Sequence, residues 1–208
     1  MTASANRHSA IVLYSDASNI QSHRVRLVLA EKDLQTDVRH LEPGVQDAEF
    51  ARLNPSLHLP ALIDRELVLY DARVIIDYLD ERYPHPPMMP VDPVSRARTR
   101  LALYRIGADW YSLRPDAAQS DKDPETAAAL LSESLTAASD VFAAMPYFFS
   151  EEYSILDATL APLLWRLPAY GIVLPEAAAP VMQYARRMFA RPGFQASLSV
   201  AEREMEHS

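Results

Sequence analysis

Five prolines fall within ten residues, 84–93, and this run separates two unlike halves of the chain. A proline drives the residue before it out of the α region, so the residues preceding these prolines are predicted to be extended. They are Tyr83, His85, Pro86, Met89 and Asp92. We therefore expect residues 83–93 to form no helix, but a stiff, polyproline-like segment with few hydrogen bonds of its own. Such a segment is typical of a linker between two domains.

The composition favours a soluble protein. Its 208 residues are 49% hydrophobic, which is enough for an ordinary globular core. A net formal charge of −8 argues against binding nucleic acid by general attraction to phosphates. No apolar run approaches the roughly 18 residues of a membrane span, and the polar N-terminus lacks a leader-like apolar segment. We expect a cytoplasmic protein that does not bind membranes.

Several kinds of chemistry are excluded or unsupported. Cysteine is absent, which excludes disulfides, thiolate zinc sites and a cysteine nucleophile. The four glycines form no phosphate-cradling motif, so nucleotide cofactors gain no support. The histidines show no spacing typical of metal ligands. We therefore expect neither a cofactor nor a metal ion.

The half before the prolines alternates strand and helix patterns. Strands are predicted at 10–15, 35–42, 61–64 and 67–70, and helices within 16–33, within 48–54 and at about 71–82. From about Val94 to Arg191 the pattern is helical, with Trp110 and Trp165 expected in the core. The predicted divisions are a disordered or extended N-terminus at 1–9, a mixed α/β domain at 10–83, the proline-rich linker at 84–93 and an all-helical domain at 94–208.

Four motifs together resemble the glutathione transferase family: "SHRVRLVLAEK", "NPSLHLPALID", "LYDARVIIDYLDERYP" and "SILDATLAP". The resemblance implies a thioredoxin-like N-terminal domain joined to an all-helical C-terminal domain. It also implies a cis peptide bond between Leu59 and Pro60. In the last motif, Ser154 and Asp157 have the spacing of a capping box at the start of an apolar helix.

The glutathione site implied by this resemblance is degenerate. Its expected members are Asn19, Leu59, Pro60, Asp71 and Ala72. Related enzymes place a hydroxyl or thiol at the start of the first helix to hold the glutathione sulfur, and Asn19 has neither. Asp71 matches a residue that holds the γ-glutamyl end, but Ala72 lacks the usual hydroxyl. Other nearby hydroxyls keep a displaced nucleophile open, namely those of Tyr14, Ser15, Ser18 and Ser22.

The histidine between the first two prolines has two interpretations. His85 is either a solvated linker residue or a binding group, because an imidazole on a stiff backbone offers a donor and an acceptor at low entropic cost. The residues around it leave both interpretations open.

The segments "LIDREL", "YLDERYPHPPMMPV", "DWYSL", "APLLWRLPAYGI" and "SLSVAEREM" resemble the stringent starvation protein A family. That resemblance implies a homodimer without catalytic activity that binds RNA polymerase holoenzyme carrying the housekeeping sigma factor. It implies control of stress, stationary-phase and virulence genes, a further transcription regulator in the complex, and no direct sequence-specific binding of DNA. The implied partner-binding surface comprises Pro84, His85 and Pro86, with Arg65, Tyr83, Met88, Met89 and Pro90 as neighbours.

Other assignments remain open. Arg96, Arg98, Arg100 and Arg105 are predicted to form two basic stripes on one helix. These arginines are either solvated or paired with acidic residues of the same chain, or they contact an acidic protein face or promoter DNA phosphate delivered by the polymerase. The alternative functions are a glutathione-dependent transferase or isomerase, and a structural or chaperone-like dimer.

Overall fold

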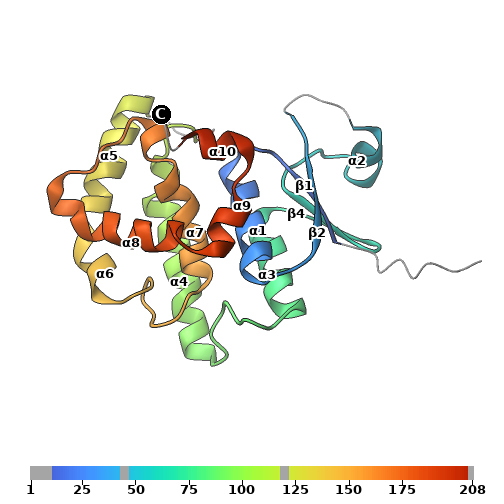
Figure 1. The fold of residues 1–208 in the computed structure, drawn as a ribbon, viewed down its shortest axis with the longest axis horizontal. Helices are drawn as coiled ribbons and strands as arrows, with labels where there is room; N and C mark the ends of the chain where they lie inside the picture. Colours follow the sequence, from blue (N-terminus) through green and yellow to red (C-terminus); the bar gives the residue numbers. More distant parts are fainter. Residues whose placement is uncertain (1–10, 43–46, 118–121, 206–208) are drawn as a thin grey trace, which may run out of the picture.

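The computed structural model describes residues 11–42, 47–117 and 122–205. The predicted extension at 1–9 lies outside the described residues. Figure 1 shows a mixed sheet with its helices beside a larger helical region. This is the glutathione transferase fold that the motifs predicted, with a thioredoxin-like N-terminal domain and a helical C-terminal domain. Within the described part of the chain, no helix is long and apolar enough to cross a membrane.

The N-terminal domain has the predicted order of elements. They are β1 (Ile11–Ser15), α1 (Ile20–Glu31), β2 (Thr36–His40), α2 (Ala48–Leu53), β3 (Ala61–Asp64), β4 (Leu67–Tyr70) and α3 (Ala72–Arg82). The sheet order is β2-β1-β3-β4, with β1 parallel to β2 and antiparallel to β3, and β3 antiparallel to β4. Helices α1 and α3 lie between the sheet and the helical region, whereas α2 lies on the other side of the sheet (Figure 1).

The C-terminal domain is built around one buried helix. Its helices are α4 (Pro93–Asp109), α5 (Pro124–Ala137), α6 (Ser139–Ala144), α7 (Ile155–Trp165), α8 (Ala179–Phe189), α9 (Pro192–Ser197) and α10 (Val200–Glu204), with short 3₁₀ turns η1 (Tyr111–Leu113), η2 (Pro168–Tyr170) and η3 (Glu176–Ala178). Every residue of α7 is buried, and the capping box of Ser154 and Asp157 is present at its start. Trp110 and Trp165 are buried, as predicted.

Helix α1 packs against helices of both domains, so it is buried on nearly all sides. It contacts α3 in its own domain and both α7 and α9 in the other. Its buried residues include Val25 and Leu29 but also the polar His23 and Arg26. A helix in this position needs internal partners for its polar side chains, because burying an unpaired polar group is costly.

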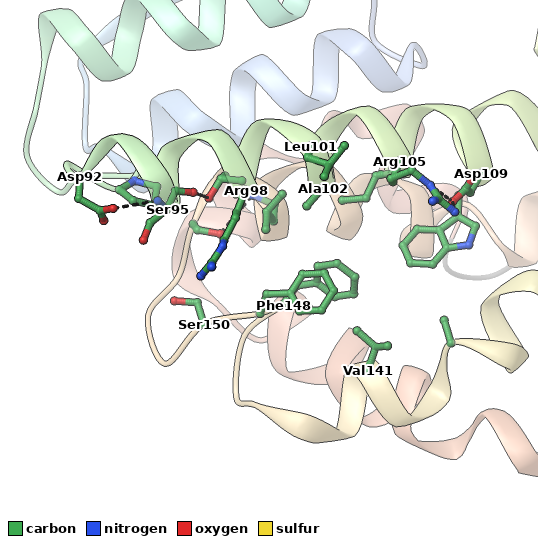
Figure 2. A pocket seen from close by; sticks show the side chains of 18 residues that line it. Asp92, Ser95, Arg98, Leu101, Ala102, Arg105, Asp109, Val141, Phe148 and Ser150 are labelled. Atoms are coloured by element: carbon green, nitrogen blue, oxygen red, sulfur yellow. Dashed lines mark hydrogen bonds and ion pairs between the residues drawn. The ribbon is translucent and has the colours of Figure 1, made fainter.

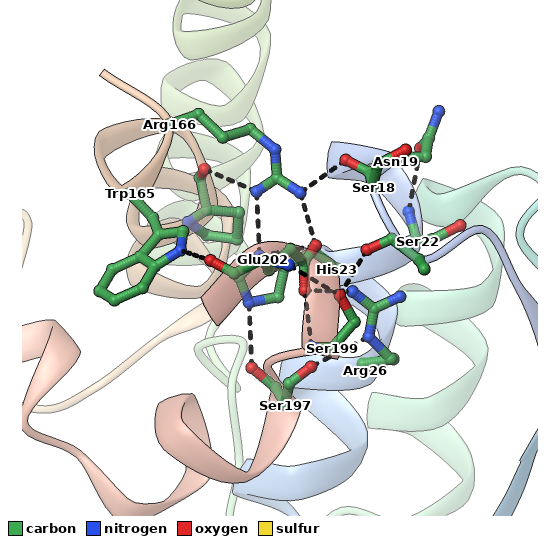
Figure 3. A network of polar contacts seen from close by, with 12 residues as sticks. Ser18, Asn19, Ser22, His23, Arg26, Trp165, Arg166, Ser197, Ser199 and Glu202 are labelled. Atoms are coloured by element: carbon green, nitrogen blue, oxygen red, sulfur yellow. Dashed lines mark hydrogen bonds and ion pairs between the residues drawn. The ribbon is translucent and has the colours of Figure 1, made fainter. Parts of the chain in front are cut away.

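A buried cluster of charges supplies those partners and fastens α10 to α1 and α7 (Figure 3). The fully buried Glu202 carboxylate accepts hydrogen bonds from Arg26 at 2.6 Å and from Arg166 at 2.5 Å. Arg166 also donates to the Ser18 carbonyl at 2.9 Å, and the Trp165 indole donates to the Glu202 carbonyl at 2.8 Å. The last helix is therefore held in place by one carboxylate shared between two arginines.

His23 lies in the same cluster as a neutral ring. The Ser197 hydroxyl donates to a backbone carbonyl, so at 3.0 Å it accepts a hydrogen bond from His23 Nε2. The unprotonated Nδ1 then accepts from Arg166, also at 3.0 Å. Burial and the positive charges of two neighbouring arginines lower the pKa of His23 well below its usual value. The 3.4 Å contact between His23 Nδ1 and Glu202 is therefore not an ion pair.

Candidate functional site

The proline-rich segment leaves α3 as a bent loop. Residues 83–92 contain no helix, but the predicted helix-free range of 83–93 is one residue too long, because Pro93 is the first residue of α4, a position that tolerates proline. The predicted polyproline-like form is wrong at one point, because the His85–Pro86 peptide bond is cis and polyproline II requires trans bonds. The Leu59–Pro60 bond is also cis, which confirms the expectation from the family resemblance.

A buried lysine holds this 83–88 loop in place. The Lys32 ammonium donates at 2.8 Å to each of three oxygens, the Asp80 carboxylate and the carbonyls of Tyr83 and Pro86. An ammonium has three donors, so all of them are satisfied here. The Lys32 side chain has no exposed surface, and the Asp80 carboxylate also accepts from the Met88 amide at 2.9 Å. The loop is therefore fixed from inside the protein, at residues on both sides of His85.

The side chains of the loop face outward. Pro84, His85, Pro86 and Pro87 are all exposed. Among the described residues, none forms a hydrogen bond or ion pair with the His85 ring, so both of its nitrogens are open to an external partner. Tyr83 is half-buried, and the Arg82 guanidinium lies 5.2 Å from the centre of its ring. The fixed backbone thus presents an imidazole, prolines and one aromatic ring together.

Met88 and Met89 do not belong to this exposed surface, contrary to the prediction. They are only 2% and 6% exposed and belong to the main hydrophobic core. The Met88 carbonyl accepts the Ile155 amide at the start of α7 at 3.0 Å. The burial has a clear reason: two large apolar side chains next to an interdomain crossing gain more by packing than by exposure. They anchor the loop from beneath.

Among the residues that the structure describes, no hydrogen bond, ion pair or ring contact places the remaining predicted neighbours, Arg65 and Pro90, on the exposed surface of the 83–88 loop. Arg65 is exposed in the turn between β3 and β4, and no hydrogen bond or ion pair joins it to the 83–88 loop among the described residues. The adjacent Asp64 accepts a hydrogen bond from Tyr78 of α3 at 2.7 Å, which ties that turn to the helix from which the loop leaves. Burial, followed by the Asp64 contact, raises the pKa of Tyr78. Pro90 is half-buried and lines a separate groove along α4.

A second cavity lies among the residues predicted for the degenerate glutathione site. It has a volume of about 480 Å³ and brings together four of the five predicted residues, Leu59, Pro60, Asp71 and Ala72. Asn19 does not line it. The other lining residues are Gln21, Arg24, His58, Tyr70 and Arg73. Four of the predicted residues therefore share one cavity, whereas Asn19, which takes the place of the expected hydroxyl or thiol, does not line it.

Both helix ends near this cavity are capped by side chains. The Asn19 amide oxygen accepts the Gln21 and Ser22 backbone amides at 2.8 and 3.2 Å, at the start of α1. The Asp71 carboxylate accepts hydrogen bonds from two backbone amides at the start of α3. The backbone of Asp71 has a positive φ of 86°. Amides at the start of α1 could stabilise a thiolate through their partial positive charge. In this protein the neutral Asn19 side chain already accepts hydrogen bonds from these α1 amides.

The alternative nucleophiles are mostly unsuitable. Tyr14 is 1% exposed and accepts a hydrogen bond from Arg39 at 3.0 Å, and burial raises its pKa. Ser15 and Ser22 are fully buried and accept hydrogen bonds from Arg26 and from a backbone amide. Ser18 is exposed and donates to a neighbouring carboxylate at 2.9 Å. Of these four hydroxyls only that of Ser18 is exposed, and Ser18 does not line the cavity beside Pro60.

The α4 arginines occupy two sides of the helix, as their spacing predicted. Arg96 lies 3.5 Å from Glu81 of α3, and Arg100 is close enough to Asp77 to influence its ionisation. Arg98 and Arg105 line the groove on another side, where Arg105 pairs with Asp109 at 2.6 Å. Much of the predicted basic stripe is therefore paired within the protein, and Arg98 stands apart.

Sequence reasoning missed Lys32 and Asp80, which position the loop. A weak signal was present, because Lys32 is one of two lysines in a chain rich in arginine and closes an apolar helix in "LVLAEKD". Only the packing of α1 against α3 brings its ammonium under a loop some fifty residues further along the chain.

Comparisons with known proteins agree with this fold. Residues 13–87 match the family described as the glutathione S-transferase N-terminal domain, and residues 101–192 match its C-terminal domain. A delta-class glutathione transferase of Nilaparvata lugens superposes with a TM-score of 0.80 over 95% of this chain and 97% of that structure. At 20% identity, this similarity shows the fold alone.

More similar sequences define the family more narrowly. The stringent starvation protein A homolog of Pasteurella multocida is 44% identical over 206 residues, 97% of this chain and 96% of that protein. The homolog of Haemophilus ducreyi is 43% identical over 201 residues, 95% of this chain and 94% of that protein. Both relatives are named as stringent starvation proteins and not as enzymes. The chain therefore belongs to the stringent starvation protein A family, built on the glutathione transferase fold.

Proposed function

We propose that this protein regulates transcription by binding RNA polymerase holoenzyme that carries the housekeeping sigma factor, without catalysis. Membership of the stringent starvation protein A family supports a regulatory role in general. In the proposed role the protein acts in the cytoplasm, controls stress, stationary-phase and virulence genes, and reaches DNA only through the polymerase. A further transcription regulator can join the same complex.

The observation that carries this proposal is the fixed 83–88 loop with His85 exposed at its centre. Binding to a flexible loop loses affinity because the loop must become ordered. Here Lys32 has already fixed the backbone, so little entropy remains to be lost. Pro84 and Pro86 offer apolar contact, and His85 offers one directional hydrogen bond to a segment of polymerase or sigma.

The degenerate glutathione site supports binding over catalysis. A transferase must lower the pKa of the glutathione thiol, and the amides that could do so at the start of α1 face the Asn19 side chain. The alternative, a glutathione-dependent transferase or isomerase, draws support from the retained cavity beside Pro60. An assay of glutathione conjugation to an aryl halide separates the two functions. Turnover comparable with ordinary transferases would contradict the regulatory role without catalysis.

A homodimer is part of the proposal. Val74 of α3 and Tyr104 of α4 are 48% and 65% exposed. The ion pair between Glu81 and Arg96 joins these two helices, so both apolar side chains can contribute to one face. Sedimentation velocity tests this directly. We expect a dimer for the wild type and a monomer for Val74→Asp/Tyr104→Asp, whereas a wild-type monomer would contradict this part of the proposal.

The central experiment is a pull-down of purified polymerase holoenzyme with tagged wild type and variants. We expect Pro84→Ala/His85→Ala/Pro86→Ala to abolish binding and His85→Ala to reduce it about tenfold, as for the loss of one hydrogen bond of roughly 1.5 kcal/mol. His58→Ala is the matched control, since His58 is another exposed histidine of the same domain. Full binding by a folded, dimeric triple variant would overturn the proposal.

A further inference from the structure

A groove of about 850 Å³ runs along α4, outside both sites described above. Its opposite wall is formed by α6 and the segment 148–156 (Figure 2). Its lining residues are Pro90, Asp92, Ser95, Arg98, Thr99, Leu101, Ala102, Arg105, Ile106, Asp109, Trp110, Ala138, Val141, Phe148, Phe149, Ser150, Ser154 and Leu156. The volume falls within the range of sites for small organic ligands, about 300–1,000 Å³.

Most of the groove is apolar. Ile106, Trp110 and Phe148 form its floor and are nearly fully buried, with the rings of Trp110 and Phe148 edge to face at 5.9 Å. Leu101 and Phe149 border the groove and are 62% and 59% exposed. A ligand with an apolar body would cover them and would meet a floor that is already packed.

One end of the groove is polar and carries an unpaired positive charge. Figure 2 shows Arg98 between Ser95 and Ser150, pointing away from α4 toward the opposite wall. No other described residue forms an ion pair or hydrogen bond with the Arg98 side chain. The Ser150 hydroxyl accepts the Glu152 amide at 3.0 Å, which leaves its hydrogen free to donate. The Ser95 hydroxyl already donates to the Asp92 carboxylate and helps to lower the pKa of that group.

The other charged side chains of the groove already have partners within the protein. Asp92 caps α4 through the Ser95 amide at 2.8 Å, and the backbone hydrogen bond lowers the pKa of its carboxyl. Arg105 and Asp109 neutralise each other at 2.6 Å. Within the described part of the chain, the groove therefore offers one cation without an ion pair, Arg98, beside the Ser150 hydroxyl at the end of a long apolar channel. The Asp92 carboxylate caps α4 at the same end and keeps its negative charge.

We propose that this groove binds a free, single-chain amphiphile with one anionic head group, of which a fatty acid is the simplest example. The carboxylate meets Arg98 and Ser150, and the chain follows α4 toward Trp110. From Ser95 to Asp109 the helix advances about 21 Å at 1.5 Å per residue, which accommodates an extended alkyl chain. This proposal does not depend on polymerase binding and assigns the protein a ligand in addition to a partner.

The two tryptophans of the chain make the test direct. Trp110 lies in the groove, whereas Trp165 lies in the charge cluster near α10. In a Trp165→Phe variant the fluorescence reports on Trp110 alone. We expect saturable changes with decanoate and dodecanoate, and an affinity that rises roughly fourfold for each added methylene. A Trp110→Phe variant should lose the fluorescence response but still bind in isothermal titration calorimetry.

The head-group assignment is tested with a charged and a neutral ligand of equal chain length. Arg98→Gln should weaken dodecanoate binding at least tenfold and leave dodecan-1-ol binding unchanged. Arg100→Gln, on another side of α4, is the matched control and should change neither. Ala102→Trp, which fills the groove, should abolish binding of both ligands in a folded protein.

Three results would overturn the proposal. The first is equal loss of dodecanoate and dodecan-1-ol affinity in Arg98→Gln, and the second is unchanged dodecanoate binding in Ala102→Trp. The third is a wild type that binds neither ligand together with an Ala102→Trp variant that no longer dimerises. A second copy of the chain would then fill the groove. Sedimentation velocity on the same samples distinguishes this last result.

Discussion

Replacing Lys32 by methionine tests whether the buried ammonium holds the 83–88 loop. Methionine has a similar length but no charge and no donors, so it fills the space and removes all three hydrogen bonds. Asp80 then keeps only the Met88 amide as a partner and is left as a buried, unpaired carboxylate. The carbonyls of Tyr83 and Pro86 also lose their donor.

The expected loss of stability is large for a single substitution. Removing one partner of a buried ion pair typically costs about 3–5 kcal/mol, mostly because the other charge stays buried. The lower end is expected here, because the outer side chains of the loop are already exposed and the loop can move into solvent at little cost. For a protein of this length, this loss corresponds to a fall in melting temperature of roughly 6–20 °C.

The assay is a double-mutant cycle measured by urea unfolding, with polymerase pull-down on every variant. Lys32→Met/Asp80→Asn should be more stable than Lys32→Met alone, because no unpaired buried charge remains and the oxygen of the introduced asparagine can still accept the Met88 amide. Both variants should bind polymerase more weakly than the wild type, since neither fixes the loop. Lys122→Met is a control at the chain's other lysine.

Two results would refute this reasoning. If Lys32→Met unfolds at the wild-type urea concentration, the ammonium does not contribute the stability assigned to it. If the double variant regains stability and also binds polymerase fully, the fixed backbone of the loop is not what the partner requires. The second result would leave the ion pair as a purely structural feature.

Three further predictions concern the buried polar groups. Asp157→Ala should lower the unfolding free energy measured in urea by about 3 kcal/mol or more, because the Tyr184 hydroxyl and two backbone amides near α7 lose their acceptor. Asp157→Asn should lower it less, since the amide oxygen can still accept hydrogen bonds. Glu202→Gln should cost about 3–5 kcal/mol, because Arg26 and Arg166 stay buried without a counter-charge; a loss below about 1 kcal/mol would contradict this. His23 stays neutral in the folded state, so as the pH falls below about 6.5 the unfolded chain takes up the proton first. The unfolding free energy should then decrease by up to about 1.4 kcal/mol per pH unit, down to the lowered pKa, and His23→Gln should remove this part of the slope.

The sequence predicted local structure well where the local signal is strong. Proline positions predicted the end of α3, and the spacing of Ser154 and Asp157 predicted the start of α7. The family motifs predicted the cis bond before Pro60. These features depend on residues close together in the chain or on motifs typical of a whole fold.

The orientation of the loop could not be predicted, because it depends on contacts between distant segments. Met88 and Met89 lie next to exposed prolines in the sequence, yet the crossing between the two domains directs both into the core. The cis bond at His85–Pro86 has no local signal beyond the general preference of proline. The local sequence around Lys32 is typical of a solvated residue at a helix end. Its burial depends on contacts with Asp80 of α3 and with the 83–88 loop, which are distant in the chain.

Helix α1 connects the two polar centres of the protein. It carries His23 and Arg26 in the charge cluster, and Lys32 caps its C-terminal end beneath the 83–88 loop, about 9 Å further along the helix axis than Arg26. Because α1 is held by polar contacts near both ends, it positions the loop relative to α10 without a conformational change. Substitution of Glu202 should therefore reduce polymerase binding only in proportion to the fraction of protein that unfolds. A larger reduction in fully folded protein would mean that the charge cluster acts on the loop through a second conformation.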